Sequence, residues 1–177
     1  DGTTSRGLGD VYKRQSLGCS VIGTVGSDEK IDIAKKFGCD HVINYSKDNF
    51  QKKVMEITNE EGLPVVYDGV GKVTMEKSLG CLKMRGTFVS FGNASGKLDP
   101  LDVGKLIAPK GLFLTRPSIA HYTATREELD EAANKLFEMV QQEKVKIDIF
   151  KKYSLNDVVN AHRDLEARKI IGPAIIV

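Results

Sequence analysis

Short apolar runs rich in β-branched residues alternate with helix-type patterns along most of this chain, and this alternation constrains its fold more than any other feature. Each apolar run has the length of a buried strand, and most are followed by a segment whose apolar residues recur at helical spacing. Because parallel strands require a crossover between them, this order predicts the α/β class, with a doubly wound parallel sheet and helices on both faces. We expect strands at residues 20–25, 41–44, 64–70, 86–91, 111–116 and 173–177. We expect helices at residues 28–37, 48–58, 74–83, 101–108, 126–143 and 155–167.

Two of the expected helices carry clear local signals. In the first, Ser27 is a residue type that caps helix N-termini, and Gly38 is the type that ends helices. The longest, at residues 126–143, has an apolar stripe that should face a core. The members of this stripe are Leu129, Ala132, Ala133, Leu136, Phe137 and Val140. The strict alternation ends after it, so we expect one domain at residues 16–145 and a separate C-terminal segment at 146–177.

The composition argues against several classes of function. The chain has 177 residues, of which 41% are hydrophobic and 28% are charged, a balance typical of globular domains. A net charge of +2 gives no argument for a nucleic-acid-binding surface, and no run of about 18 apolar residues is present to cross a membrane. Cys19, Cys39 and Cys81 lie far apart in the sequence, so we expect small buried thiols in a reducing compartment. We therefore predict no nucleic-acid partner, no membrane segment and no metal site.

Glycines and small polar residues follow the expected strands. In open parallel sheets, ligands bind beyond the carboxyl ends of the strands, and glycine allows the backbone to approach a ligand closely. The segments that follow the first five expected strands are residues 26–30, Tyr45, 68–71, 92–93 and 117–118. The sequence therefore predicts a binding site at this edge of the sheet.

The segment after the first strand bears on the choice of cofactor. In dinucleotide-binding folds an acidic residue here holds the ribose 2′-hydroxyl of NAD, whereas a cation and small donors suit the 2′-phosphate of NADP. This strand ends at Gly26 and Ser27, and Lys30 follows one helical turn later, which suits a phosphate at a helix N-terminus. An alternative stays open in which Ser27 is only a helix cap and Lys30 only a surface lysine. Asp28 and Glu29 are interpreted as acids of the first helical turn.

Catalytic residues cannot be assigned from the sequence. The three histidines are isolated, and no pairing of a nucleophile with a base is recognisable. Residues 69–72 have a partial likeness to a phosphate-binding loop, but Val66 stands where that loop needs a glycine. Asp68, which ends an expected buried strand, is interpreted as a cap of the following turn.

Several strings of residues resemble, in order and spacing, those of one known family. They are GTVGSDEK (23–30), GCDHVINY (38–45), VYDGVG (66–71), GTFVSFGNASG (86–96), LTRPS (114–118), TREEL (125–129) and the tail from residue 153 to 177. Together, from Ser16 to Val177, the chain is similar to the cofactor half of the zinc-free quinone oxidoreductases of the medium-chain dehydrogenase/reductase superfamily. The resemblance implies a Rossmann-type sheet that lacks its first strand and glycine loop. It also implies that the C-terminal segment belongs to the catalytic domain that binds the substrate.

The resemblance implies NADPH as the cofactor and gives roles to the matched residues. The residues around the adenosine 2′-phosphate would be Ser27, Lys30, Tyr45 and Arg168, and Gly26, at the end of the preceding strand, would also bind the cofactor. Those lining the nicotinamide ribose would be Val89, Ser90, Phe91 and Gly92. Those near the carboxamide end would be Thr115, Arg116, Pro117 and Ser118.

The implied activity is hydride transfer from NADPH to a quinone or another electron-poor carbonyl or enone, without zinc. The family further implies a cytoplasmic homodimer that pairs through the edge strand at residues 111–116. We expect this chain by itself to be inactive, since the substrate domain precedes it in the family. Two alternatives stay open: an NADPH-binding or structural protein without turnover, similar to the lens crystallins of this family, and a reductase of enoyl thioesters or alkenals.

Residues 1–15 do not fit the family pattern. They read DGTTSRGLGDVYKRQ where the family has its first strand and glycine-rich turn, and no strand precedes Gly7. Their end resembles the translated end of a transposon used in DNA library preparation, so we expect a foreign segment joined at Ser16. A sheet without its first strand would expose an apolar central edge, and we expect poor solubility of the chain.

Overall fold

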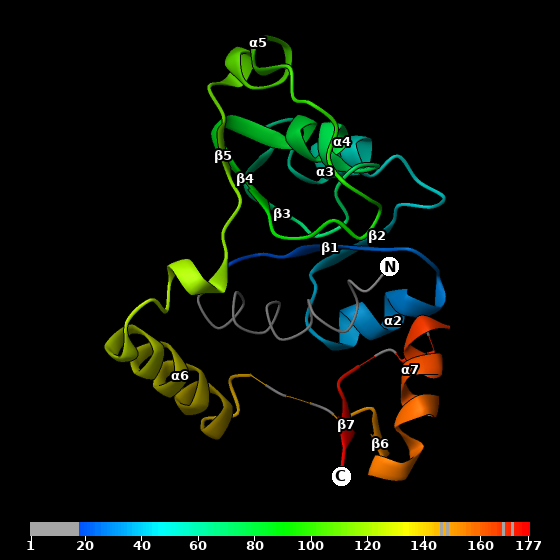
Figure 1. The fold of residues 1–177 in the computed structure, drawn as a ribbon. Helices are drawn as coiled ribbons and strands as arrows, with labels where there is room; N and C mark the ends of the chain where they lie inside the picture. The colour runs from blue at the N-terminus through cyan, green and yellow to red at the C-terminus, as the bar shows by residue number, and fades with distance from the viewer. Residues whose placement is uncertain (1–17, 146, 148, 168, 171) are drawn as a thin grey trace. The chain divides into compact units, whose positions relative to one another are not determined.

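The computed structural model describes residues 18–145, 147, 149–167, 169–170 and 172–177 (Figure 1). The expectation that residues 1–15 are foreign therefore lies outside the described residues. The chain divides into two compact units, one formed by Asp1–Val42 with Glu131–Val177 and the other by Ile43–Asp130. Each unit has its own hydrophobic cluster of buried residues.

Three parallel strands form the sheet of the second unit. In sheet order they are β3 (Leu63–Asp68), β4 (Leu82–Ser90) and β5 (Phe113–Thr115). Asp68 pairs with Ser90, and Val89 pairs with Thr115, so the carboxyl ends of all three strands coincide. The loops that follow the strands consequently leave the sheet at one edge, where the sequence predicts a binding site.

Short helices precede, connect and follow these strands. They are α3 (Phe50–Ile57), α4 (Met75–Gly80), α5 (Val103–Leu106) and the 3-10 turns η1 (Ala108–Lys110) and η2 (Ile119–His121). The core of the unit combines residues of α4 and β4 with one that precedes β5: Met75, Leu79, Leu82, Phe88 and Leu112. Leu82 and Phe88 have no exposed surface, so β4 is the centre of this core.

The first described part of the chain is a βαβ segment, with β1 (Ile22–Val25), α2 (Glu29–Lys36) and β2 (His41–Asn44). β1 and β2 form a two-stranded sheet, and α2 buries Ala34 against Val25 and Cys39. The Asp40 carboxylate accepts hydrogen bonds from the N–H of Val21 at 2.7 Å and from Ser20 Oγ at 3.3 Å. The bond from Val21 is the main reason that the pKa of Asp40 lies below its usual value.

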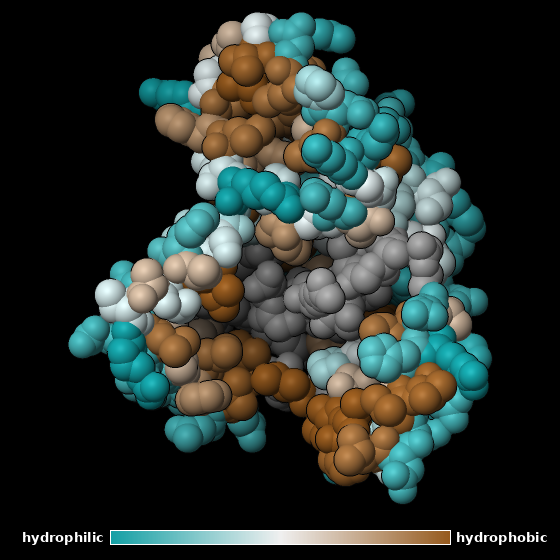
Figure 2. All heavy atoms as spheres, in the orientation of Figure 1, coloured by the Kyte–Doolittle hydropathy of each residue, from teal (hydrophilic) through white to brown (hydrophobic). Residues whose placement is uncertain are grey.

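The C-terminal part begins with the long helix α6 (Arg126–Gln141). After it come β6 (Lys151–Tyr153), η3 (Leu155–Asp157), α7 (Val158–Glu166) and β7 (Ala174–Ile176). β6 and β7 are parallel and form a two-stranded sheet of their own. Apolar side chains lie at the surface over α6 and over this tail (Figure 2), among them Leu136 and Phe137.

The α/β class with parallel strands is confirmed. Instead of one sheet, the described residues contain β1–β2 and β3–β4–β5 as separate sheets. In the doubly wound strand order 3-2-1-4-5-6, the first strand lies between these two groups.

Several local predictions were wrong. Ser27 is not the cap of α2: Asp28 occupies the N-cap position in a helical conformation, and the Ser27 carbonyl accepts a hydrogen bond from the N–H of Lys30. β4 starts at Leu82 rather than at residue 86, because an irregularity with Arg85 at a φ of 57° is included in the strand. The strand β6 was not predicted at all.

Two expectations of burial were also wrong. Cys39 and Cys81 are buried as expected, but Cys19 is exposed. The apolar stripe of α6 does not reach a core, since no residue of this helix is buried and Phe137 is 60% exposed. Helical spacing predicts an apolar face, but it does not say whether the surface that covers this face is present in the same chain.

Candidate functional site

Asp68, the last residue of β3, holds the turn that leads into α4. Its side chain is 4% exposed, and Oδ1 accepts hydrogen bonds from the N–H groups of Val70 at 2.8 Å and Gly71 at 2.9 Å. Oδ2 accepts hydrogen bonds from Thr74 Oγ1 and Ser78 Oγ, both at 2.8 Å. A buried carboxylate is costly unless donors surround it, as they do here. The interpretation of Asp68 as a turn cap is confirmed.

The loops after β3 and β4 are joined to each other. Three backbone hydrogen bonds connect them, from Phe91 to Asp68, from Ala94 to Gly69 and from Ser95 to Val70. Ser95 adds its side chain, since Oγ donates to the Val70 carbonyl at 2.7 Å and accepts from the Val73 N–H at 3.1 Å. The two loops therefore form one connected structure beyond the sheet.

Two glycines allow these loops to cross at van der Waals contact. A Cβ atom on Gly92 would lie 2.4 Å from the carbonyl oxygen of Gly69, which no real side chain tolerates. A Cβ atom on Gly69 would lie 2.9 Å from the ring of Phe91, so this ring rests against the glycine. The Phe91 side chain remains 45% exposed at the edge of the sheet. The crossing thus leaves an aromatic surface partly exposed beside the two loops.

Arg116, directly after β5, connects the third loop to the second. Its Nη1 lies 3.1 Å from Ser90 Oγ and 3.3 Å from the Ser90 carbonyl oxygen. When the Asn93 amide is oriented to satisfy its hydrogen bonds, Arg116 Nη2 donates to Oδ1 at 3.3 Å and Nδ2 donates to the Gly92 carbonyl at 2.8 Å. We call the connected set of Asp68–Gly71, Ser90–Ser95 and Arg116 the carboxyl rim.

The structure brings together part of the predicted site. Ser90, Gly92 and Arg116 meet in the carboxyl rim, and Val89 is paired with Thr115 beneath it. Pro117 and Ser118 follow Arg116 along the chain, with Pro117 half-buried and Ser118 exposed.

The residues predicted around the 2′-phosphate are divided between the two units. Gly26, Ser27 and Lys30 are half-buried in the first unit, at the end of β1 and the start of α2. Tyr45, also half-buried, lies in the second unit, and Arg168 lies outside the described residues. Their common role at a phosphate stays a prediction.

Gly69 and Asn93 lie in segments that were predicted at the binding edge, but they were given no role at the cofactor, and Ser95 was not predicted there at all. Each is a small residue just beyond an apolar run, and this signal was visible in the sequence. Their contacts with one another depend on the register of β3 and β4, which the sequence does not give.

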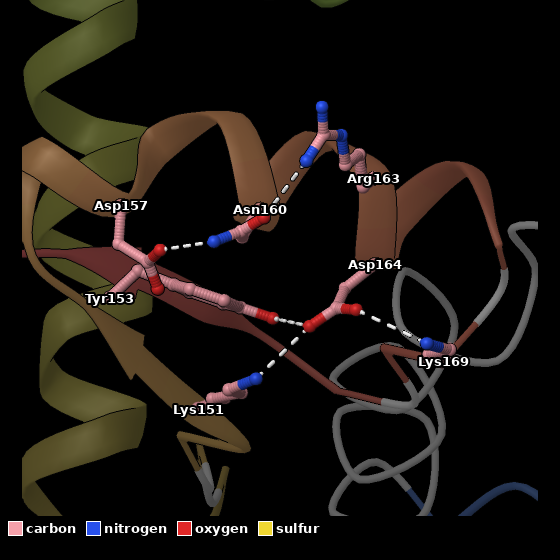
Figure 3. Close-up of polar contacts among 7 residues, drawn as sticks. All are labelled: Lys151, Tyr153, Asp157, Asn160, Arg163, Asp164 and Lys169. Carbon is pink, nitrogen blue, oxygen red and sulfur yellow. Dashed lines mark hydrogen bonds and ion pairs between the residues drawn. The ribbon is translucent and has the colours of Figure 1, made fainter.

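The tail contains a second polar cluster, around Asp164 of α7 (Figure 3). Its Oδ2 accepts hydrogen bonds from Tyr153 at 2.8 Å and from Lys151 at 3.0 Å, and Lys169 Nζ lies 3.6 Å from Oδ1. The hydrogen bond from Lys151 is the main reason that the pKa of Asp164 is lowered, while loss of solvation is the main reason that the pKa of Tyr153 is raised. The Lys151 ammonium also lies 4.4 Å from the centre of the Tyr153 ring. The cluster ties α7 to β6.

Cys81 is not a candidate nucleophile. Its side chain is 2% exposed, and burial raises the pKa of the thiol to about 12, although the charge of Lys110 acts in the opposite direction. Only the thiolate is reactive, so this thiol is inert at neutral pH. Lys110 instead donates hydrogen bonds to the carbonyl oxygens of Gly80 at 3.0 Å and Leu82 at 2.6 Å.

Two kinds of feature, a metal-binding group and a membrane-spanning helix, are absent from the described residues. No three His, Cys, Asp or Glu side chains are grouped there so that they could hold a metal ion. No helix in the same residues combines the length and the apolar character that crossing a membrane requires.

The parallel strands alternate with helices, and glycine-containing loops at their carboxyl ends are hydrogen-bonded to one another. This arrangement defines a domain of the Rossmann type. Comparison with known sequences identifies which Rossmann-type family this is. The chain belongs to the zinc-binding dehydrogenase family, whose sequence model matches residues 13–142.

Individual relatives confirm the resemblance to quinone oxidoreductases. The chain is 42% identical to quinone oxidoreductase 1 of Escherichia coli (strain K12) over 165 residues, which is 92% of this chain and 50% of that protein. It is 41% identical to the 2-haloacrylate reductase of a Burkholderia species over 162 residues, which is 91% of this chain and 49% of that protein. The chain thus spans about half the length of the curated relatives it matches.

Solved structures have the same fold. The structure of the Escherichia coli quinone oxidoreductase complexed with NADPH aligns with a TM-score of 0.92 and 40% identity, over 99% of this chain and 55% of that one. The structure of a 2-haloacrylate reductase aligns with a TM-score of 0.91 and 39% identity, over 98% of this chain and 54% of that one. The Rossmann-type architecture predicted from the sequence is confirmed.

Proposed function

We propose that this chain is the NADPH-binding part of an oxidoreductase that transfers a hydride to quinones or related electron-poor carbonyl and enone substrates. The observation that carries the proposal is the 40% identity, at a TM-score of 0.92, to a quinone oxidoreductase complexed with NADPH. When bound, NADPH supplies the hydride, and the protein binds it, orients it and excludes water.

The residues of the chain suit such a cofactor at both of its ends. Lys30 lies in the first turn of α2, where its charge adds to the partial positive charge of the helix N-terminus and favours a phosphate. Ser27, just before this turn, can donate a hydroxyl to the same phosphate. In the carboxyl rim, Phe91 offers a half-exposed ring against which a planar nicotinamide can pack. Catalytic residues stay unassigned.

The test uses the extended protein, in which residues 18–177 of this chain follow the N-terminal half of the Escherichia coli quinone oxidoreductase 1. We expect it to bind NADPH and to oxidise it in the presence of a small quinone. Binding without turnover on any electron-poor substrate would favour the NADPH-binding or structural alternative. Failure of the folded extended protein to bind NADPH would contradict the proposal.

A second candidate substrate class is an electron-poor alkene. The 41% identity to a 2-haloacrylate reductase favours it, and reduction of a conjugated double bond uses the same hydride donor. The extended protein should be assayed with 2-chloroacrylate and with a quinone in parallel. Turnover of the acrylate without turnover of the quinone would replace the first candidate by the second.

We propose that the chain by itself lacks turnover, because about half the length of its relatives has no counterpart in it. The assay of the isolated chain with NADPH and a quinone tests this statement. A steady rate similar to that of the extended protein would contradict it.

We also propose that the protein is a homodimer that pairs through β5. This strand is at the edge of its sheet in the described residues, and its Phe113 and Leu114 side chains are 62% and 46% exposed. An unpaired edge with apolar side chains favours association. Light scattering of the extended protein should give the mass of a dimer, and a Phe113→Lys, Leu114→Lys double variant should give that of a monomer.

Finally, we propose that the activity is zinc-independent and that the protein acts in the cytoplasm. The isolated positions of its histidines and cysteines in the sequence support the first statement. Activity of the extended protein should survive a strong chelator, and its loss, with recovery on adding zinc, would contradict the statement. Fractionation of the source cells tests the location.

A further inference from the structure

The guanidinium of Arg116 forms hydrogen bonds within the protein, although the residue as a whole is exposed. The hydrogen bonds described for it go to the end of β4 and the loop that follows, through Nη1 to the Ser90 carbonyl and Oγ and through Nη2 to Asn93. Ser90 is 2% exposed, so Arg116 has a buried partner in this interaction. A residue that was predicted to contact the cofactor is thus engaged within the protein.

The loop after β4 is fixed from two sides. On one side it is bonded to the loop after β3, through Phe91, Ala94 and Ser95. On the other side Arg116 contacts Ser90, the last residue of β4, and Asn93 within the loop, with two different nitrogen atoms. Asn93 in turn donates to the carbonyl of Gly92, the residue that crosses Gly69.

We infer that Arg116 is a positioning residue, whose planar guanidinium holds the Ser90–Asn93 loop in the conformation that receives the nicotinamide half of the cofactor. This inference rests on the proposed function. It assigns Arg116 a role through its neighbours and not as a cation that binds a cofactor phosphate. A lysine does not replace it, because its single ammonium nitrogen lacks the rigid planar fork with which arginine reaches two partners at once.

The test compares Arg116→Lys with the unsubstituted extended protein, in affinity for NADPH and NADH and in melting temperature. Arg126→Lys is the matched control, since Arg126 forms an exposed ion pair with Asp130 at 2.9 Å on α6. We expect Arg116→Lys to weaken both cofactors by the same factor, about tenfold, because two charge-assisted hydrogen bonds are lost on the loop. We expect Arg126→Lys to leave both affinities unchanged.

The outcomes separate the possible roles of Arg116. An equal loss of affinity for both cofactors supports a positioning role. The double variant with Asn93→Ala should then lose less binding free energy than the two single variants together. The inference would be overturned if Arg116→Lys kept its affinity for NADPH while Arg116→Gln lost affinity for NADPH alone. That pattern would show that the positive charge of Arg116 binds the phosphate that NADH lacks. A lower melting temperature with both affinities unchanged would also overturn it. Absence of NADPH binding by the unsubstituted extended protein would instead overturn the proposed function.

Discussion

The carbonyl oxygen of Gly69 lies 2.4 Å from the position that a Cβ atom would take on Gly92. The obstacle is backbone, so Gly92→Ala can be accommodated only if the two loops of the carboxyl rim separate. We expect the variant to lower the free energy of unfolding of the extended protein by about 1–3 kcal/mol, the usual cost of overpacking. We also expect weaker NADPH binding. Urea denaturation and fluorescence titration measure the two effects.

Gly104→Ala is the matched control for this prediction. Gly104 lies in the helix α5, and a Cβ atom there would meet only Asp102 Oδ1, at 3.4 Å. Because alanine is favoured over glycine within helices, the change should be neutral or stabilise by up to about 1 kcal/mol. Equal losses for both variants would show that the crossing of Gly69 and Gly92 has no special importance.

Replacing Asp68 should cost much of the stability of the second unit. Asp68→Ala removes the acceptor of the Ser78 hydroxyl and of two backbone N–H groups, and it leaves the Thr74 hydroxyl with the Gly71 carbonyl oxygen at 3.2 Å. We expect a loss of about 3 kcal/mol or more in the free energy of unfolding, measured by urea denaturation. The exposed carboxylate of Asp99, paired with Lys72, provides the comparison, and Asp99→Asn should change the free energy by less than about 1 kcal/mol. A loss for Asp68→Ala as small as this would contradict the role of Asp68.

The order of strands and helices could be predicted because the period of the apolar residues differs between the two types of element. Every strand except β6 was expected close to its observed place, since runs such as those of β3 and β4 are apolar and β-branched. β6, with the sequence Lys-Lys-Tyr, has no such signal and is held by its pairing with β7. Long-range pairing of this kind cannot be derived from local sequence.

The candidate site was predictable as a location but not as a set of contacts. The small residues after β3 and β4 pointed to the carboxyl edge, and the register confirms that these ends coincide. The hydrogen bonds of Arg116 and the crossing of Gly69 with Gly92 depend on side-chain and loop geometry. A sequence pattern gives residue types at an edge, and it could not show that Arg116 forms hydrogen bonds with Ser90 and Asn93.

Lys30 should determine the preference for NADPH over NADH. If its ammonium binds the 2′-phosphate, Lys30→Ala weakens NADPH binding to the extended protein by roughly 1.5–3 kcal/mol, the scale of a charge-assisted hydrogen bond. NADH has no such phosphate, so its affinity should barely change. Lys35→Ala, in the last turn of the same helix, is the control and should affect neither cofactor. Equal losses for NADPH and NADH would refute the assignment of Lys30.

The Asp164 cluster should stabilise the tail in a pH-dependent way. The pKa of Asp164 in the folded protein is lowered from the ordinary value of 3.8. Its contribution to stability is therefore present above pH 3.8 and disappears as the pH falls through the folded pKa. Asp164→Asn should therefore lower the melting temperature of the extended protein at neutral pH, and the difference should shrink below about pH 4. Asp157→Asn, at the N-cap of α7 and in contact with Asn160 (Figure 3), should have a smaller effect at neutral pH. A difference that is unchanged in acid would argue that the cluster is not electrostatic in origin.

Cys81 should make the folded chain sensitive to alkali. Below pH 9.0, the ordinary thiol pKa, both folded and unfolded states keep the proton. Above it the unfolded state releases the proton, whereas the folded state, with its pKa at about 12, retains it. The free energy of unfolding therefore falls with rising pH, by up to about 1.4 kcal/mol per pH unit from this group. Urea denaturation between pH 8 and about pH 10.5 should show a shallower fall for Cys81→Ala, while Cys19→Ala, at an exposed position, should follow the unsubstituted protein. Identical slopes for all three proteins would mean that the Cys81 thiol reaches solvent in the folded state.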